Sequence, residues 1–326
     1  MKLFIQYTTL VIFTLLIYGC KNESIQEQLD KEFGKYFEEV KPENQKFYEA
    51  YNKALELWGV PYGEVNIKTS FGNAYVIVSG PESGEPIVLL HGMNATSTMW
   101  YPNVKALAKN HRVYAIDFFL EPGKSEYKGK IKNMEDVMAW YNEIFKQLKI
   151  EKFSLIGASR GGWQAVYIAL QHKNQVKNMI LLSPAQTFIP INPGFEILTN
   201  IIYTLNPERK KLLDVLETMT VNVDNIRQTY IDQYFIATQK ASLNKIILQM
   251  RPYSDGELKS LTMPVLLLIG DHDIINNEKS IERAQKVLPH AYTGIVKNAG
   301  HFLSIDQSEK VNTKMLDFLD ANSKLD

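Results

Sequence analysis

The chain has one cysteine, no excess of either charge and no motif typical of a bound metal or nucleotide. Cys20 cannot form a disulfide within one chain, so the folded state must depend on a buried apolar core. Lysine plus arginine and aspartate plus glutamate number 36 each, so no bulk field attracts nucleic acid. Paired C-x-x-C, H-E-x-x-H and Walker-type glycine motifs are missing, and the sequence therefore predicts no metal and no cofactor.

Long apolar runs are also scarce, and the one candidate lies at the N-terminus. Met1-Lys2 precedes an apolar run over Leu3–Tyr18, which ends at Gly19-Cys20. This pattern predicts a secretory signal peptide over residues 1–19. The ending resembles a bacterial lipobox, which implies a lipid-anchored Cys20 and an extracytoplasmic membrane lipoprotein. An uncleaved N-terminal anchor helix and a secreted protein are the alternatives.

Residues 20–60 have the pattern of a tether followed by a helical leader. Aromatic and apolar side chains recur there at helical spacing: Phe33, Tyr36, Phe37, Phe47, Tyr51, Leu55 and Trp58. We expect this stripe to pack on the main domain as core rather than to form a ligand site.

Beyond the leader, apolar strand patterns alternate with helical patterns. The predicted strands are 64–69, 74–79, 86–90, 112–116, 153–156, 179–182, 264–269 and 292–296, with a hairpin turn at 71–73 between the first two. The predicted helices are 99–109, 134–148, 162–171, 278–287 and 308–319. The alternation predicts an α/β fold with a mostly parallel, doubly wound sheet of about eight strands, spanning 61–183 and 258–326.

One interval interrupts the alternation. Residues 184–257 show no strand pattern after the sixth strand, only helical stretches near 194–205, 207–219, 224–239 and 243–250. An insertion at the carboxyl end of a strand overhangs the edge where such sheets bind ligands. We interpret it as a helical cap.

The pentapeptide Gly157-Ala158-Ser159-Arg160-Gly161 is the most informative motif. It joins a predicted strand to a predicted helix, the context of a G-x-S-x-G nucleophile elbow. Glycine on both sides gives room for the tight turn and leaves the Ser159 hydroxyl exposed. An ordinary strand-to-helix turn with a capping serine is the alternative for the pentapeptide alone.

Three further motifs follow the expected strands. They are His91-Gly92-Met93 after the third strand, Asp271-His272-Asp273 after the seventh and Asn298-Ala299-Gly300-His301-Phe302 after the last. With the elbow, their order resembles that of the α/β-hydrolase family over about residues 60–320. Because four separate motifs carry this resemblance, it is more specific than the elbow alone.

The resemblance implies a catalytic triad of Ser159 as nucleophile, His301 as base and Asp273 as the acid that orients the base. Asp271 is the rival for the acid, and the family's spacing favours Asp273. The resemblance also implies an oxyanion hole made by the backbone N–H groups of Met93 and Arg160.

The sequence departs from the family's pattern at two places. The loop 117–125 is one residue longer than the family's D-x-x-G-x-G-x-S loop and has one glycine, and we interpret it, with Ser125, as structural. Arg160 stands where an apolar residue is usual, and its side chain is expected either to pair on the surface or to reach into the pocket. The His91 side chain is interpreted as a brace for its loop.

These features predict a serine hydrolase that cleaves carboxylic esters through an acyl-enzyme, with a small-molecule ester as its partner. Two alternatives stay open: a ligand-binding or receptor-like protein on the same scaffold, and a serine-dependent C–C hydrolase or perhydrolase.

Overall fold

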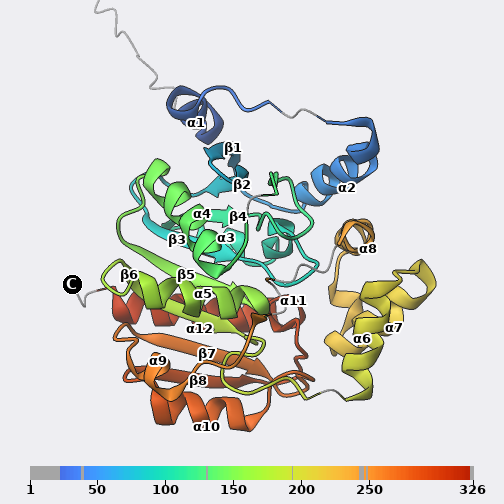
Figure 1. Ribbon diagram of the computed structural model, residues 1–326, viewed down its shortest axis with the longest axis vertical. Coiled ribbons are helices and arrows are strands. Elements are labelled where there is room, and N and C mark those ends of the chain that lie inside the picture. Colours follow the sequence, from blue (N-terminus) through green and yellow to red (C-terminus); the bar gives the residue numbers. More distant parts are fainter. Residues whose placement is uncertain are drawn as a thin grey trace, which may run out of the picture.

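The structure is a computed structural model that describes residues 23–323 apart from 38–39, 130, 193, 242–245 and 247–248. In this part of the chain eight strands form one sheet in the spatial order β1-β2-β4-β3-β5-β6-β7-β8 (Figure 1). The strands are β1 (Tyr62–Thr69), β2 (Gly72–Ser79), β3 (Glu85–Leu90), β4 (His111–Ile116), β5 (Phe153–Ala158), β6 (Val176–Leu182), β7 (Val265–Gly270) and β8 (Ala291–Val296). The predicted α/β fold with a mostly parallel sheet is confirmed.

Only β2 runs antiparallel to its two neighbours, β1 and β4; from β4 to β8 the strands are parallel. Parallel strands place their carboxyl ends at one edge of the sheet. The loops after β3, β5, β7 and β8, which carry the four motifs, therefore meet there.

Alternation along the strands divides the core into two apolar clusters, one on each face. In β3, Val88 and Leu90 belong to one cluster, and Ile87 and Leu89 belong to the other. Helices of the first face are α1 (Ile25–Phe33), α4 (Met134–Gln147), α5 (Arg160–Gln171), α9 (Asp255–Lys259) and α10 (Glu278–Val287). Helices of the second face are α2 (Gln45–Leu55), α3 (Val104–Leu107), α11 (Leu303–Asp306) and α12 (Ser308–Asn322).

The interval between β6 and β7 contains α6 (Phe195–Leu205), α7 (Arg209–Met219) and α8 (Gln228–Lys240), which stand to one side of the sheet (Figure 1). These helices match three of the predicted stretches closely. The predicted helix over 243–250 falls largely outside the described residues. The boundaries of the cap as a domain stay a prediction.

The leader forms α1 and α2, and α2 packs against the second face of the sheet and against α8 (Figure 1). The Trp58 indole N–H donates to Ser79 Oγ at 2.8 Å and anchors the end of the leader to β2. Phe47 packs under the Lys240 ammonium of α8, with 5.4 Å between the ammonium and the ring centre. Most of the aromatic stripe is core, as expected, but Phe37 lies between the helices and is 78% exposed.

The free edge of β1 is covered by α1. The Gln26 side-chain amide accepts the Glu64 N–H at 2.8 Å and donates to the Glu64 carbonyl at 3.1 Å. It therefore takes the two hydrogen bonds that a neighbouring strand would make at this residue.

Two predictions were wrong in detail. The single helix over 99–109 is instead a 3₁₀ turn at Ser97–Trp100 followed by the short α3, because Pro102 has no N–H to continue a helix. The hairpin turn is at 70–71 rather than 71–73, since Thr69 pairs directly with Gly72.

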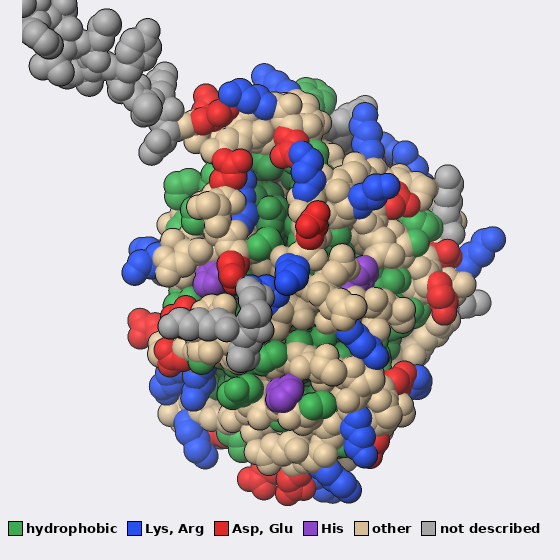
Figure 2. All heavy atoms as spheres, turned by 90° about the vertical axis from the view of Figure 1, so that its left-hand side faces the viewer, with side chains coloured by type: hydrophobic (Ala, Val, Ile, Leu, Met, Phe, Trp, Pro, Cys, Tyr) green, Lys and Arg blue, Asp and Glu red, His purple; other side chains and the backbone are tan. Residues whose placement is uncertain are grey.

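The N-terminal signal peptide and Cys20 lie outside the described residues. Within the part that is described, no helix has the length and apolar character needed to cross a bilayer. On the face in Figure 2, cationic and anionic side chains are interspersed, in keeping with the balanced charge of the chain.

Candidate active site

The elbow forces Ser159 into an unusual backbone conformation. Its φ is 51° and its ψ is −117°, a region that costs a non-glycine residue about 1–3 kcal/mol. Glycine is required on both sides of the serine. A Cβ on Gly157 would lie 2.2 Å from the Gly161 carbonyl oxygen, and one on Gly161 would lie 2.1 Å from the Leu90 carbonyl oxygen. The turn therefore presents Ser159 at the carboxyl end of β5 and at the N-terminus of α5.

Ser159, His301 and Asp273 form one chain of hydrogen bonds. His301 Nε2 is 2.8 Å from Ser159 Oγ, and His301 Nδ1 is 2.9 Å from Asp273 Oδ1. Because a carboxylate only accepts, Nδ1 holds the proton and Nε2 is left as the acceptor for the serine hydroxyl. The residues come from three loops that are distant in sequence, after β5, β8 and β7.

The Asp273 carboxylate is buried, and its partners keep it ionised. Burial opposes ionisation, but His301 and the hydrogen bond from the Ile275 N–H outweigh it and lower the pKa of Asp273. The Asn276 side chain also donates to the second carboxylate oxygen at 3.1 Å. A negative charge therefore faces the imidazole across the neutral pH range.

Asp271 lies next to this chain of hydrogen bonds, but its own bonds go to Ala299 and His272 and not to His301. Its Oδ1 accepts the Ala299 N–H at 3.1 Å and a bond from His272 Nδ1 at 2.8 Å. Burial alone would raise its pKa, but these hydrogen bonds lower it to about 2. Asp271 thus ties the loop after β7 to the loop that carries His301.

The loop after β3 is held by the side chain of His91. The Phe118 N–H donates to His91 Nε2 at 2.9 Å, so the ring proton is on Nδ1, which donates to the Gly92 carbonyl at 2.9 Å. A trans peptide points its N–H away from its carbonyl, so this bond fixes the direction of the Met93 N–H. Burial, with a smaller contribution from the Arg160 charge, lowers the pKa of His91 to about 4.

The loop 117–125 is organised around the buried Asp117. Its carboxylate accepts from the Ser97 and Lys124 N–H groups, both at 2.8 Å. The Ser125 hydroxyl donates to the Asp117 carbonyl at 2.6 Å and accepts the Tyr75 N–H. These are structural bonds, as the sequence suggested for this loop.

The Arg160 side chain follows the first of its two expected courses only in part. It is 3% exposed and forms an ion pair with Glu121, whose side chain is 4% exposed. The guanidinium also lies over the Phe118 ring, 5.3 Å from its centre. It therefore pairs as expected, but inside the protein and not on its surface.

Sequence reasoning missed Asp306. This buried carboxylate accepts the Gly300 N–H at 2.7 Å, the Val221 N–H at 3.0 Å and the Asn222 N–H at 3.1 Å. It joins the His301 loop to the segment after α7. No motif marks it, because two of its three partners lie in a segment that is far away in the sequence.

Known proteins with the same fold resemble this chain in sequence. A family model described as the alpha/beta hydrolase fold matches residues 85–206. A Bacillus subtilis (strain 168) protein described as an uncharacterized carboxylesterase, nap, is 33% identical over 290 residues, which are 85% of this chain and 93% of the relative. The chain belongs to the α/β-hydrolase fold family.

Two solved structures of this α/β-hydrolase family resemble the chain over most of its length. Naproxen esterase (carboxylesterase NP) from Bacillus subtilis is 32% identical with a TM-score of 0.80. The match covers 86% of this chain and 100% of the chain of that esterase. Carboxylesterase CesB (YbfK) from Bacillus subtilis is 30% identical with a TM-score of 0.77. The match covers 84% of this chain and 97% of the chain of that carboxylesterase.

In this α/β-hydrolase the Ser159 hydroxyl faces a small apolar cavity of about 30 Å³. Its apolar lining includes Met93, Met99, Tyr230, Phe302, Leu303 and Ile305. Tyr230 comes from α8, so a helix of the predicted cap forms one wall of the site. This volume has room for a water molecule but not for an ester, so these side chains must separate when a substrate enters.

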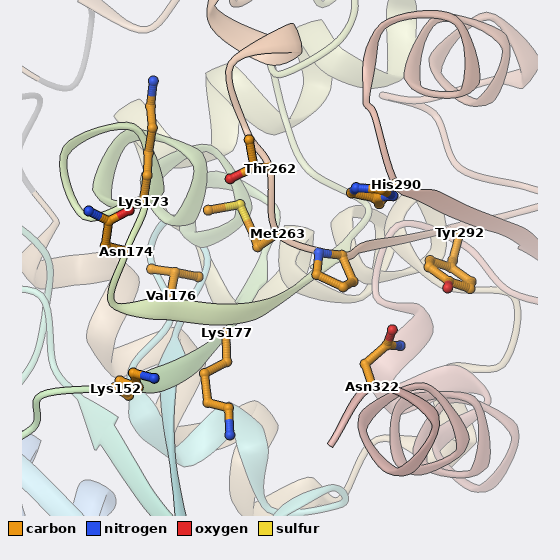
Figure 3. A pocket seen from close by; sticks show the side chains of 11 residues that line it. Lys152, Lys173, Asn174, Val176, Lys177, Thr262, Met263, His290, Tyr292 and Asn322 are labelled. Carbon is orange, nitrogen blue, oxygen red and sulfur yellow. The ribbon is translucent and has the colours of Figure 1, made fainter. Parts of the chain in front are cut away.

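A wider groove of about 410 Å³ lies at the amino ends of the strands, on the side of the sheet away from Ser159 (Figure 3). Its lining includes four basic side chains, Lys152, Lys173, Lys177 and His290. Lys177 is paired with Glu85 at 3.0 Å. The groove is remote from the carboxyl ends of the strands, where Ser159 lies. The described part of this α/β-hydrolase also contains no cluster of three or more metal-ligating side chains.

Proposed function

We propose that the protein is a carboxylesterase that uses Ser159, His301 and Asp273 as its catalytic triad. The observation that carries this proposal is the continuous hydrogen-bonded chain from the serine hydroxyl to the buried carboxylate. Carboxylesterase relatives at 30% identity or more support the ester bond as the target.

The mechanism follows from the geometry. Ser159 Oγ attacks the ester carbonyl while His301 Nε2 takes its proton, and the carbonyl oxygen becomes an oxyanion. The N–H groups of Met93 and Arg160 are proposed to bind that oxyanion. The first N–H groups of a helix have no intrahelical partner, so the N–H of Arg160 is available.

Collapse of this intermediate breaks the carbon–oxygen bond, and His301 gives its proton to the leaving alcohol. Water then attacks the acyl-enzyme with His301 again as base, and Ser159 regains its proton as the acid leaves. The ionised Asp273 stabilises the imidazolium in both steps and holds the ring in the productive tautomer.

Cleavage of a p-nitrophenyl ester series by a soluble fragment starting at Lys21 tests this activity. We expect acyl chains from two to about ten carbons to be cleaved unequally, because the apolar cavity must open to accept them. A fluorophosphonate probe should label the wild type and spare Ser159→Ala. Ser125→Ala is the matched control and should label normally, and equal labelling of Ser159→Ala would refute the nucleophile.

The alternatives predict other outcomes. A ligand-binding protein would bind esters without turnover, and a C–C hydrolase or perhydrolase would prefer another substrate over simple esters. The intact hydrogen-bonded triad favours the enzyme over the binding protein.

We also propose that the mature chain begins at an acylated Cys20 on the outer side of the cell membrane. The lipobox-like ending of the apolar N-terminal run supports this proposal. The leader and the core would then lie outside the cytoplasm, attached through the tether.

A further inference from the structure

The two places where the sequence departs from the family's pattern are partners in the structure. Glu121 belongs to the lengthened loop, and Arg160 takes the usual apolar position in the elbow. Their side chains form a buried ion pair across 39 residues of sequence. Arg160 Nε and Nη2 are buried with no hydrogen-bond partner among the described residues, so Glu121 is the principal partner of the cation.

The second oxygen of the same carboxylate reaches the other wall of the proposed oxyanion hole. Glu121 Oε2 accepts the Asn94 N–H at 2.6 Å. Asn94 follows Met93 directly, and its φ of 59° places it in the left-handed region, where the loop turns sharply. One carboxylate therefore contacts both segments whose backbone N–H groups would bind the oxyanion.

We propose that Glu121 is a positioning residue that clamps the loop of Met93 to the start of α5 and sets the spacing of the two oxyanion donors. This inference rests on the proposed function. A donor helps only when it lies at hydrogen-bond distance from the developing charge, and small displacements cost much of its effect. Glu121 is not among the residues that line the cavity at Ser159, so the clamp acts through the two backbone segments that it contacts.

The clamp predicts a specific kinetic defect. In Glu121→Gln the loop keeps an acceptor for Asn94, but Arg160 loses its counter-charge in a buried position. We expect kcat to fall about 10- to 100-fold with KM changed less than about twofold, because the oxyanion forms only in the transition state. The affinity for an alkylboronic acid, which forms a tetrahedral adduct on the serine, should fall by a similar factor.

Loss of one partner of a buried pair also destabilises the fold, so a second variant separates the two effects. The double variant Glu121→Leu with Arg160→Met replaces the pair by apolar side chains. We expect its melting temperature to recover towards the wild-type value while its kcat stays low. Glu64→Gln is the matched control. It removes the charge that pairs with the buried Lys124, which belongs to the same loop as Glu121 but lies away from the serine. It should lower the melting temperature and leave kcat unchanged.

The outcomes separate the clamp from the proposed function. A wild type that neither cleaves the ester nor binds the boronate overturns both. A wild type that does both, with folded Glu121 variants that keep full kcat, overturns the clamp alone. Recovery of kcat together with the melting temperature in the double variant also overturns it, since the pair would then be structural only.

Discussion

At the scale of single residues, the structure gives two neighbouring carboxylates different surroundings. Asp273 contacts the imidazole of His301, whereas Asp271 accepts a backbone N–H from Ala299, in the loop that carries His301. Asp273→Asn should therefore cut kcat by about 10³–10⁴ with the fold intact, because the amide favours the wrong tautomer of the base. Asp271→Asn should change kcat little and lower the melting temperature.

Kinetics on one ester, with melting curves of both variants, measure this difference. An inactive Asp271→Asn beside an active Asp273→Asn would reverse the assignment. Full activity in both would remove the triad mechanism and favour a binding protein.

His91 gives the protein a second test, through pH. Its buried ring has a pKa of about 4, below the ordinary value of 6.5, so the unfolded chain binds this proton more readily. Stability from this group is present above pH 6.5 and is lost as the pH falls to about 4, on the order of a few kcal/mol.

Melting temperatures between pH 7 and pH 4 should therefore fall less steeply in His91→Gln than in the wild type. His290→Gln, at an exposed position, is the matched control and should follow the wild type. An unchanged slope in His91→Gln would show that another group causes the acid sensitivity.

At the scale of elements, strained backbone gathers at the carboxyl edge of the sheet. Positive φ angles occur at Asn94 after β3, Ser159 after β5, Ser183 after β6 and Asn298 after β8. Such conformations persist only where surrounding contacts hold them. The loops of the proposed site are therefore the part of the fold that depends most on side-chain hydrogen bonds.

Asp306 tests this dependence, because its carboxylate holds Gly300 next to His301. In Asp306→Asn the amide nitrogen would face a backbone N–H, so we expect about 1–3 kcal/mol of lost stability together with a lower kcat. Melting curves and ester kinetics measure both. Asp317→Asn, exposed on α12, is the control and should change neither. Loss of stability at full kcat would limit Asp306 to holding the cap segment.

The sequence predicted the strands and the motifs because their signals are local. Apolar runs mark buried strands, and the motif residues follow them at fixed spacing. Helix α9 was missed although Ser254 and Glu257 form a capping box, a local signal that could have found it. The Glu121–Arg160 pair could not be predicted. In the sequence each residue is only a separate departure from the family's pattern, and the fold alone brings the two side chains together.

At the scale of the whole molecule, the proposed lipid on Cys20 would attach the protein to a membrane. If Cys20 is acylated, the wild type should sediment with membranes, and Cys20→Ala should be released or left unprocessed. Fractionation with mass spectrometry of the N-terminus measures this. A wild type found free in the medium and without a lipid would refute the anchor.

The hydrogen bonds between Gln26 and the edge strand β1 bear on how a soluble fragment should be made. A fragment that begins after α1 would leave this edge of the sheet open to pairing with the same edge of another molecule. Such a fragment would keep all the proposed catalytic residues and still tend to self-associate as its concentration rises. We therefore expect α1 to limit association between molecules through this edge, in addition to any role in attachment.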